Sequence, residues 1–111
     1  MTHHRITSGY ALEDTFGYCR AVKAGNTVYV SGTTARNEDL DLDAVGQAHA
    51  IFAIIKGALE KAGSGFPDVV RTTIYLADMK DAEAVGRVHG EYFGAIKPAL
   101  TMIARWRSYP P

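Results

Sequence analysis

Residues 68–104 read DVVRTTIYLADMKDAEAVGRVHGEYFGAIKPALTMIA, and this stretch decides the predicted fold. The alternation of side chains from Val69 to Leu76 is typical of a half-buried strand. Pro98-Ala99 ends the helix that follows and opens a second strand, from Leu100 to Trp106. Two strands joined through one helix predict a crossover, with the helix packed on one face of a sheet. The apolar residues that define the helix by their three-to-four-residue spacing are Val85, Val88, Tyr92 and Ile96.

Two further strands are expected before this unit, from Tyr18 to Ala24 and from Thr27 to Thr33. Gly25-Asn26 lies between them and is a tight-turn signal of a β-hairpin. Gly32 interrupts the second strand, and glycine at such a position often marks a bulge or a close approach of backbone to another group.

A long helix is expected from its N-cap, Asp43, to about Ala62, where Gly63-Ser64-Gly65 ends it. Residues 1–16 are weakly patterned and are expected to form the exposed start of a first strand. The order strand, strand, helix, strand, helix, strand predicts one α+β domain over residues 1–111, with two helices on one face of a mixed sheet. The apolar stripe of the long helix is Val45, Ala48, Phe52, Ile55, Leu59 and Ala62.

The sheet face away from the helices is expected to carry aromatic and polar side chains. Exposure to solvent is one interpretation, since antiparallel sheets often have one wet face. Tyrosine and arginine are enriched at protein interfaces, however, so contact between subunits is the favoured one. The helices should cover Val28, Val30, Val70, Ile74 and Leu76. The open face should hold Tyr29, Ser31, Arg71, Thr73 and Tyr75.

Charge and cysteine content argue against several classes of function. Twelve basic residues balance twelve acidic ones, so no basic excess points to nucleic acid. A single cysteine, Cys19, allows neither an internal disulfide nor a cysteine-built zinc site, and it favours a reducing compartment. No stretch reads as a secretory signal or a membrane span. The expected location is therefore cytoplasmic, with no membrane partner.

The order and spacing of these motifs resemble the YjgF/RidA family, also called endoribonuclease L-PSP proteins. GYCRAVKAGNTVYVSGTT (17–34) resembles the family's hairpin, residues 68–94 resemble its strand–helix core, and Pro98-Ala99 resembles the pair that opens its late strand. The resemblance implies a chorismate-mutase-like subunit and a homotrimer with ligand clefts between subunits. It also implies hydrolysis of reactive enamines and imines to 2-keto acids and ammonia, without metal or organic cofactor.

The positions that match the family's cleft identify candidate substrate-binding residues, and no catalytic residue is assigned. In the family, an arginine directly follows the proline-alanine pair and can hold a substrate carboxylate through two charge-assisted bonds. Here that position is the neutral Leu100, and the family's helix asparagine is Gly86. The family's water-positioning glutamate belongs to a final strand that would follow Pro111. The candidate residues are Tyr18, Ser31, Gly32, Leu100 and Thr101.

Each polar candidate has a functional and a structural interpretation. Ser31 could orient a water or bind a carbonyl, or its hydroxyl could be satisfied inside an interface. Tyr18 could cap a ligand or serve packing. Arg20 and Lys97 could replace the missing cation, although solvated side chains are favoured for both. Three further side chains lack a catalytic partner at a recognisable spacing. Cys19 is expected to be a buried structural thiol, and His49 and His89 are expected to be structural or surface histidines.

Three functions are compatible with these features. The first is a divergent hydrolase of the enamine/imine deaminase type. The second is a non-catalytic trimer that binds a small acid or imine in the same clefts, which Leu100 favours over a standard version of the first. The third is a ribonuclease, and the zero net charge weighs against it.

Overall fold

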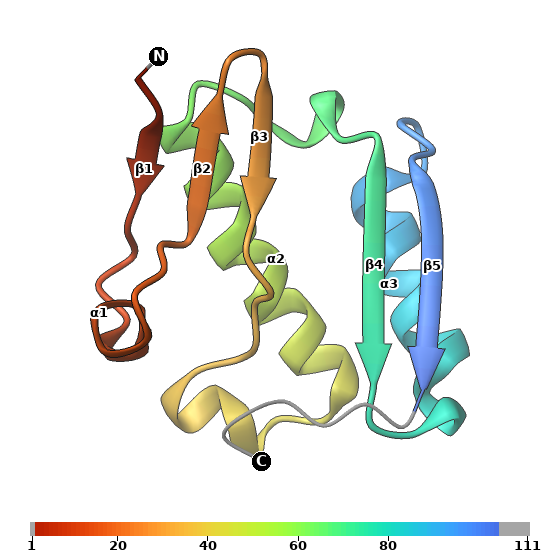
Figure 1. The fold of residues 1–111 in the computed structure, drawn as a ribbon. Coiled ribbons are helices and arrows are strands. Elements are labelled where there is room, and N and C mark those ends of the chain that lie inside the picture. The colour runs from red at the N-terminus through yellow and green to blue at the C-terminus, as the bar shows by residue number, and fades with distance from the viewer. Residues whose placement is uncertain (1, 105–111) are drawn as a thin grey trace.

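A computed structural model describes residues 2–104 of the chain (Figure 1). The expected α+β character is confirmed, and the segment before Tyr18 forms a short strand and a short helix rather than a strand alone. Three short 3-10 turns occupy Asn37–Asp41, Phe66–Asp68 and Met79–Asp81. The strands and α-helices are β1 (His4–Ile6), α1 (Ala11–Phe16), β2 (Ala21–Ala24), β3 (Thr27–Val30), α2 (Ala44–Lys61), β4 (Arg71–Leu76), α3 (Ala82–Phe93) and β5 (Ala99–Ala104).

The strands form two sheets that lie side by side (Figure 1). β1, β2 and β3 pair antiparallel, whereas β4 and β5 pair in parallel around α3, so the predicted hairpin and the predicted crossover are both confirmed. Within residues 2–104 no ladder joins β3 to β4, and the single mixed sheet that we expected is divided there. Alternation in sequence tells which face a strand buries, but it does not tell which strand lies beside it.

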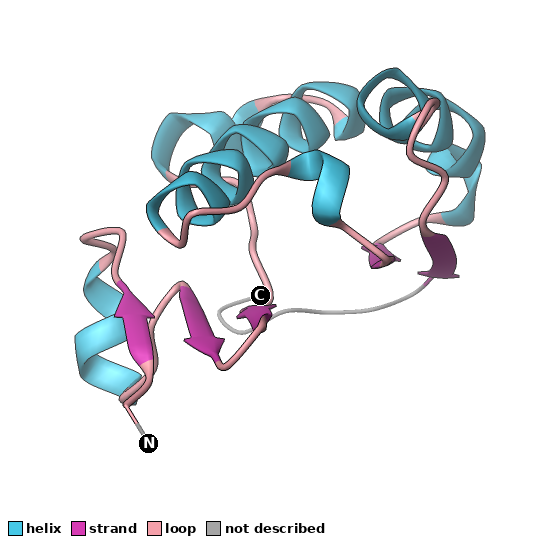
Figure 2. Ribbon diagram, turned by 90° about the horizontal axis from the view of Figure 1, so that it is seen from above, coloured by secondary structure: helices cyan, strands magenta, loops and turns pink. Residues whose placement is uncertain are grey.

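Both long helices cover the same face of the two sheets, as expected (Figure 2). The first half of α2 packs with α3 and β4, while its second half packs under the antiparallel sheet. α2 thus joins two hydrophobic clusters into one domain. The first cluster is centred on Ala48, Phe52, Leu76, Val85, Val88 and Phe93. The second contains Ile6, Ala21, Ala58 and Ala62.

The ends of α2 follow the sequence signals. The Asp43 side chain accepts a hydrogen bond from the Gly46 backbone N–H at 2.8 Å, which confirms it as the N-cap. Gly63 follows the helix with φ of 79°, a left-handed conformation that favours glycine. α3 instead ends at Phe93, so Ile96 packs against the core from the connection to β5 rather than from the helix.

Val70 is a wrong prediction, because it is 80% exposed instead of covered by the helices. The turn Phe66–Asp68 is followed by Val69, whose side chain packs against the core in place of Val70. Regular strand geometry begins only at Arg71. The alternation therefore cannot be extended back to Val70. The predicted end of the last strand, Trp106, lies outside the described residues.

The two histidines on the long helices take the two expected roles, since His89 is structural and His49 lies at the surface. Buried His89 lies against the Phe52 and Phe93 rings, and its Nε2 is 2.8 Å from the Thr72 hydroxyl oxygen. Burial lowers the pKa of His89 because it disfavours the charged imidazolium. Exposed His49 places Nδ1 2.7 Å from the Tyr92 hydroxyl. None of the helices in residues 2–104 is both long and apolar enough to span a membrane.

Candidate functional site

A cleft of about 480 Å³ lies between α1 and the open face of the antiparallel sheet. Two candidate residues from the sequence, Tyr18 and Ser31, line it together. Strand geometry explains why the cleft is on this face. Ile6 and Ala21 form a pair across β1 and β2, and both side chains are buried on the side of α2. The adjacent pair, Arg5 and Val22, therefore points to the opposite face of the sheet. The lining residues are Arg5, Thr7, Glu13, Asp14, Gly17, Tyr18, Cys19, Val22 and Ser31.

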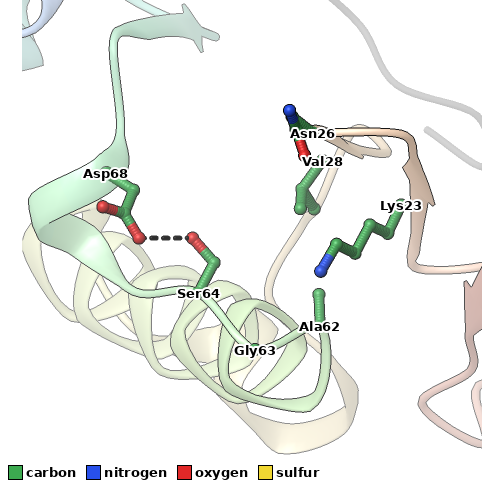
Figure 3. Close-up of a pocket in the computed structure, with 7 residues that line it drawn as sticks. All are labelled: Lys23, Asn26, Val28, Ala62, Gly63, Ser64 and Asp68. Atoms are coloured by element: carbon green, nitrogen blue, oxygen red, sulfur yellow. Dashed lines mark hydrogen bonds between the residues drawn. The ribbon is translucent and has the colours of Figure 1, made fainter.

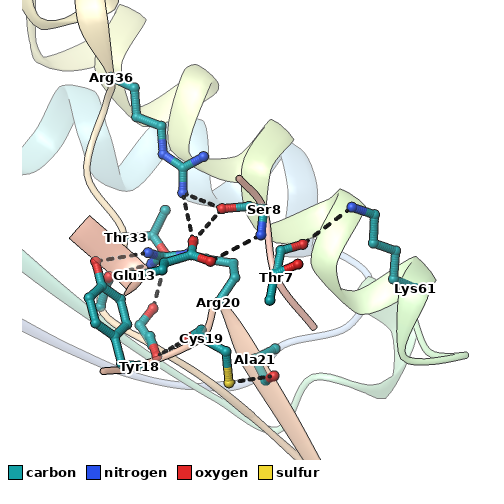
Figure 4. Close-up of polar contacts among 12 residues, drawn as sticks. Thr7, Ser8, Glu13, Tyr18, Cys19, Arg20, Ala21, Thr33, Arg36 and Lys61 are labelled. Atoms are coloured by element: carbon teal, nitrogen blue, oxygen red, sulfur yellow. Dashed lines mark hydrogen bonds and ion pairs between the residues drawn. The ribbon is translucent and has the colours of Figure 1, made fainter. Parts of the chain in front are cut away.

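A buried ion pair lies beside this cleft, and its carboxylate, Glu13, lines it (Figure 4). Arg20 is 2% exposed and Glu13 is 3% exposed, and Arg20 Nε lies 3.3 Å from Glu13 Oε2. The expectation that Arg20 is solvated is therefore wrong. The physical reason is α1: its C-terminal Gly17 has φ of 77°, and the chain turns back there so that Glu13 lies over β2.

Glu13 is surrounded by hydrogen-bond donors. It accepts from the Ser8 backbone N–H at 3.1 Å and from the Ser8 hydroxyl, and Arg36 Nη2 lies 3.7 Å from its Oε2. Arg36 also lies over the Tyr10 ring, with 4.5 Å from its guanidinium carbon to the ring centre. Burial alone would raise the pKa of Glu13, but the Ser8 hydrogen bonds and the Arg20 charge outweigh it and hold the pKa of this carboxyl below its usual value.

Arg20 fixes two of the candidate site residues. Its Nη1 donates to the Gly32 carbonyl at 2.7 Å and to the Thr33 hydroxyl at 3.0 Å, and its Nη2 donates to the Tyr18 hydroxyl at 3.3 Å. Arginine has no acceptor, so the Tyr18 oxygen must accept in this pair. The Tyr18 O–H proton is therefore directed away from Arg20 and remains available to a ligand in the cleft.

The hydroxyl of Ser31 is engaged by the main chain. Ser31 Oγ donates to the Cys19 carbonyl at 2.7 Å, and the Ser31 backbone N–H donates to the Arg20 carbonyl at 2.9 Å. These bonds tie the end of β3 to the segment before β2. The Ser31 oxygen can still accept a hydrogen bond, for example from a water. Cys19, expected to be buried, is half-buried, and its Sγ donates to the Ala21 carbonyl at 3.4 Å.

Leu100 and Thr101 lie elsewhere in the chain, on β5 in the parallel sheet (Figure 1). Leu100 is 42% exposed, and the Thr101 hydroxyl accepts from Arg71 Nη1 at 3.0 Å. One chain thus brings Tyr18, Ser31 and Gly32 together but leaves Leu100 and Thr101 in the other sheet, where they face opposite sides of β5. Lys97, the other cation considered, is exposed just before β5 and does not line the cleft.

A second hollow, of about 320 Å³, lies on the helix side of the hairpin (Figure 3). The Ser64 hydroxyl donates to Asp68 Oδ2 there at 2.9 Å. This hollow contains none of the candidate site residues, and we do not assign it a function. It is lined by Lys23, Asn26, Val28, Ala62, Gly63, Ser64 and Asp68.

Arg5 and Glu13 were not predicted as cleft residues from the sequence. β1 is only three residues long, which is too short for alternation to be recognised. The one available signal for α1 is Gly17 directly after ALEDTF, where glycine commonly follows a helix end. Among residues 2–104 no group of three or more His, Cys, Asp and Glu side chains is arranged to hold a metal ion.

The fold and the cleft define an α+β subunit with an open, tyrosine-bearing sheet face, and comparison with known proteins gives its family. The model of the family "Endoribonuclease L-PSP" matches residues 9–105. The chain belongs to this family, also known as YjgF/RidA. A crystal structure of a Mycobacterium tuberculosis member of the YjgF/YER057c/UK114 family superposes with a TM-score of 0.87 at 35% identity, covering 98% of this chain and 90% of that one.

Two curated relatives are similar to this chain over most of its length. An uncharacterised protein of Streptomyces coelicolor is 38% identical over 89% of this chain and 76% of its own length. The 3-aminoacrylate deaminase RutC of Acinetobacter baylyi is also 38% identical, over 74% of this chain and 68% of its own length.

Proposed function

We propose that this protein is a cofactor-free hydrolase of the enamine/imine deaminase type with a divergent substrate. The observation that carries the proposal is the 38% identity to a 3-aminoacrylate deaminase over 74% of the chain. The cleft supplies suitable groups, because the Tyr18 hydroxyl can donate a proton and the Ser31 oxygen can accept a hydrogen bond from a water and so orient it. The substrate is expected to differ from the family's usual one because Leu100 cannot bind a carboxylate.

Imine hydrolysis requires few catalytic groups. An imine carbon is electrophilic and accepts water readily, so the protein has mainly to hold the imine beside a water and move protons. Water adds to the carbon, the nitrogen is protonated, and ammonia leaves as the carbonyl forms. A half-buried Tyr18 held by Arg20 suits the role of a fixed donor in these steps.

The alternative is a non-catalytic trimer that binds a small acid or imine in the same cleft. Leu100 favours this alternative, since the clamp that the family resemblance implies is absent from that position. Binding needs only the cleft, whereas turnover also needs a proton donor beside the reacting carbon.

Release of ammonia from freshly generated imines that carry a carboxylate at different distances from the imine carbon separates these two functions. We expect the protein to accelerate hydrolysis of at least one imine over the buffer rate. Tyr18→Phe should lower kcat/KM for that imine by about tenfold or more, because one hydrogen bond to the reacting group is lost. Saturable binding without acceleration of any imine would contradict the hydrolase and support the binding protein.

We also propose that the protein is a homotrimer assembled through the open faces of its sheets. Large apolar side chains are exposed there in the single chain: Tyr29 (63%), Tyr75 (49%) and Ile103 (41%). Exposed apolar side chains on one face are typical of protein–protein contact surfaces when they form a continuous patch. A trimer would also allow the β5 surface of one subunit to meet the cleft of another. The cytoplasmic location expected from the sequence stays a prediction.

Sedimentation equilibrium should give three times the 12.0 kDa chain mass at micromolar concentration. Tyr75→Asp should reduce this mass, because a carboxylate placed against apolar partners is costly to desolvate. Ala84→Asp is the matched control, since it adds the same charge at an exposed position of α3, away from the sheet face. A monomeric wild type, or an intact trimer in Tyr75→Asp, would contradict the assignment of this interface.

A further inference from the structure

We propose that Arg5 is the specificity-determining residue by which the cleft recognises the negative charge of its substrate. The inference rests on the proposed function and names its substrate class: small acids in which a carboxylate accompanies the imine or enamine but is not attached to the reacting carbon. It assigns the charge recognition to β1, and not to the Leu100 position on β5.

The register of β1 fixes where Arg5 points. Ile6 is 3% exposed and packs into the second hydrophobic cluster, so its neighbour Arg5 must face the opposite side of the sheet. On that side Arg5 pairs with Val22, and Val22 pairs with Tyr29. Arg5 and Val22 both line the cleft with Tyr18 and Ser31.

Arg5 is also the arginine of this region that remains available to a ligand. Arg20 and Arg36 both lie within ion-pair distance of Glu13. No ion pair or hydrogen bond within residues 2–104 engages the Arg5 guanidinium. Its planar fork of N–H donors matches a carboxylate and can bind both oxygens at once.

The charge balance of the cleft favours a monoanion. The charged side chains that line the cleft are Arg5, Glu13 and Asp14. Arg20 and Arg36 do not line it, but both lie within ion-pair distance of Glu13, and the five groups together carry one formal positive charge. Glu13 is already paired with Arg20 and Arg36, and exposed Asp14 is the remaining carboxylate. A small acid would restore neutrality. The Tyr18 O–H, turned away from Arg20 by the bond that its oxygen accepts, supplies a second donor.

Pyruvate and pyruvamide test the inference because they differ in the charge of one group. Binding of each to the native oligomer would be measured by NMR titration for the wild type, Arg5→Ala and Lys23→Ala. Arg5→Ala should weaken pyruvate binding by about tenfold or more, the loss expected for a charge-assisted hydrogen bond. Pyruvamide affinity should stay unchanged, and only pyruvate binding to proteins that retain Arg5 should weaken with added salt.

Lys23→Ala is the matched control, because Lys23 is on the neighbouring strand but lines the hollow on the helix side. It should leave pyruvate binding unchanged. The inference is overturned if wild type does not bind pyruvate, if Arg5→Ala binds it as tightly as wild type, or if Lys23→Ala shows the loss instead. Arg5-dependent binding of pyruvate without turnover of any imine would keep this inference and reject the hydrolase, so the two failures are distinguishable.

Discussion

Arg20→Ala should lower the free energy of unfolding by about 3–5 kcal/mol, the cost of leaving one partner of a buried ion pair unpaired. Arg20 and Glu13 are 2% and 3% exposed, so water cannot replace the lost guanidinium. The Gly32 carbonyl and the Thr33 hydroxyl lose their donor in the same variant. Urea denaturation at pH 7 and one fixed protein concentration would measure the effect.

Two further variants show whether the unpaired charge is the cause. Arg87→Ala removes an exposed arginine from its pair with Glu83 on α3 and should scarcely change stability. Arg20→Ala combined with Glu13→Gln should recover part of the loss, because the buried site then no longer holds a carboxylate without its guanidinium partner. A loss below about 1 kcal/mol in Arg20→Ala would contradict the buried pair.

The pH dependence of stability should follow from the same pair. The pKa of Glu13 is held below its ordinary value in the folded chain, by the Ser8 hydrogen bonds and the Arg20 charge. Between the folded and the unfolded pKa of Glu13, the folded state therefore binds fewer protons than the unfolded state. The contribution of Glu13 to the free energy of unfolding is fully present above the unfolded pKa. It is lost as pH falls from the unfolded pKa through the folded one. This acid-dependent contribution, measured by urea denaturation across acidic pH, should be absent in Glu13→Gln.

Local signals in the sequence were sufficient for the elements that bury one regular face. Asp43 and Gly63 mark the ends of α2, and the spacing of Val85 and Val88 identifies α3, because each signal depends on a few neighbouring residues. Val70 failed because a turn directly before it changed which side chain faces the core. The division into two sheets was not predictable, since strand pairing is decided by distant parts of the chain.

The site residues, too, could be predicted only where they are close together in the sequence. Tyr18 and Ser31 meet as expected because they belong to one hairpin, whereas Leu100 and Thr101 lie in the other sheet. Arg20 was expected in solvent, as most arginines are. Its burial depends on α1 turning back over β2 to bring a carboxylate to it, and six residues of helix give too weak a pattern to predict that contact.

Wild-type protein should release pyruvate from 2-aminoacrylate at a rate close to the buffer background. In 2-aminoacrylate the carboxylate is attached to the carbon that water attacks, so the group that holds the carboxylate also positions that carbon. The family resemblance implies an arginine for this role, and Leu100 stands in its place. Hydrogen bonds to charged groups contribute about 1.5–3 kcal/mol each, so the loss of a two-bond clamp should cost on the order of a hundredfold or more.

Arg5 does not restore this activity in our interpretation, because it holds a carboxylate from β1 whereas Leu100 lies on β5. A displacement of the reacting carbon by about 1 Å is enough to cost about a hundredfold. Stopped assays with freshly generated 2-aminoacrylate would compare the wild type, Leu100→Arg and Arg5→Ala with an arginine-bearing family member. A wild type as fast as that member would contradict the role assigned to Leu100. If Arg5→Ala then abolished the activity, Arg5 would be the replacement clamp, and a carboxylate bound from β1 would be able to place the imine carbon for attack after all.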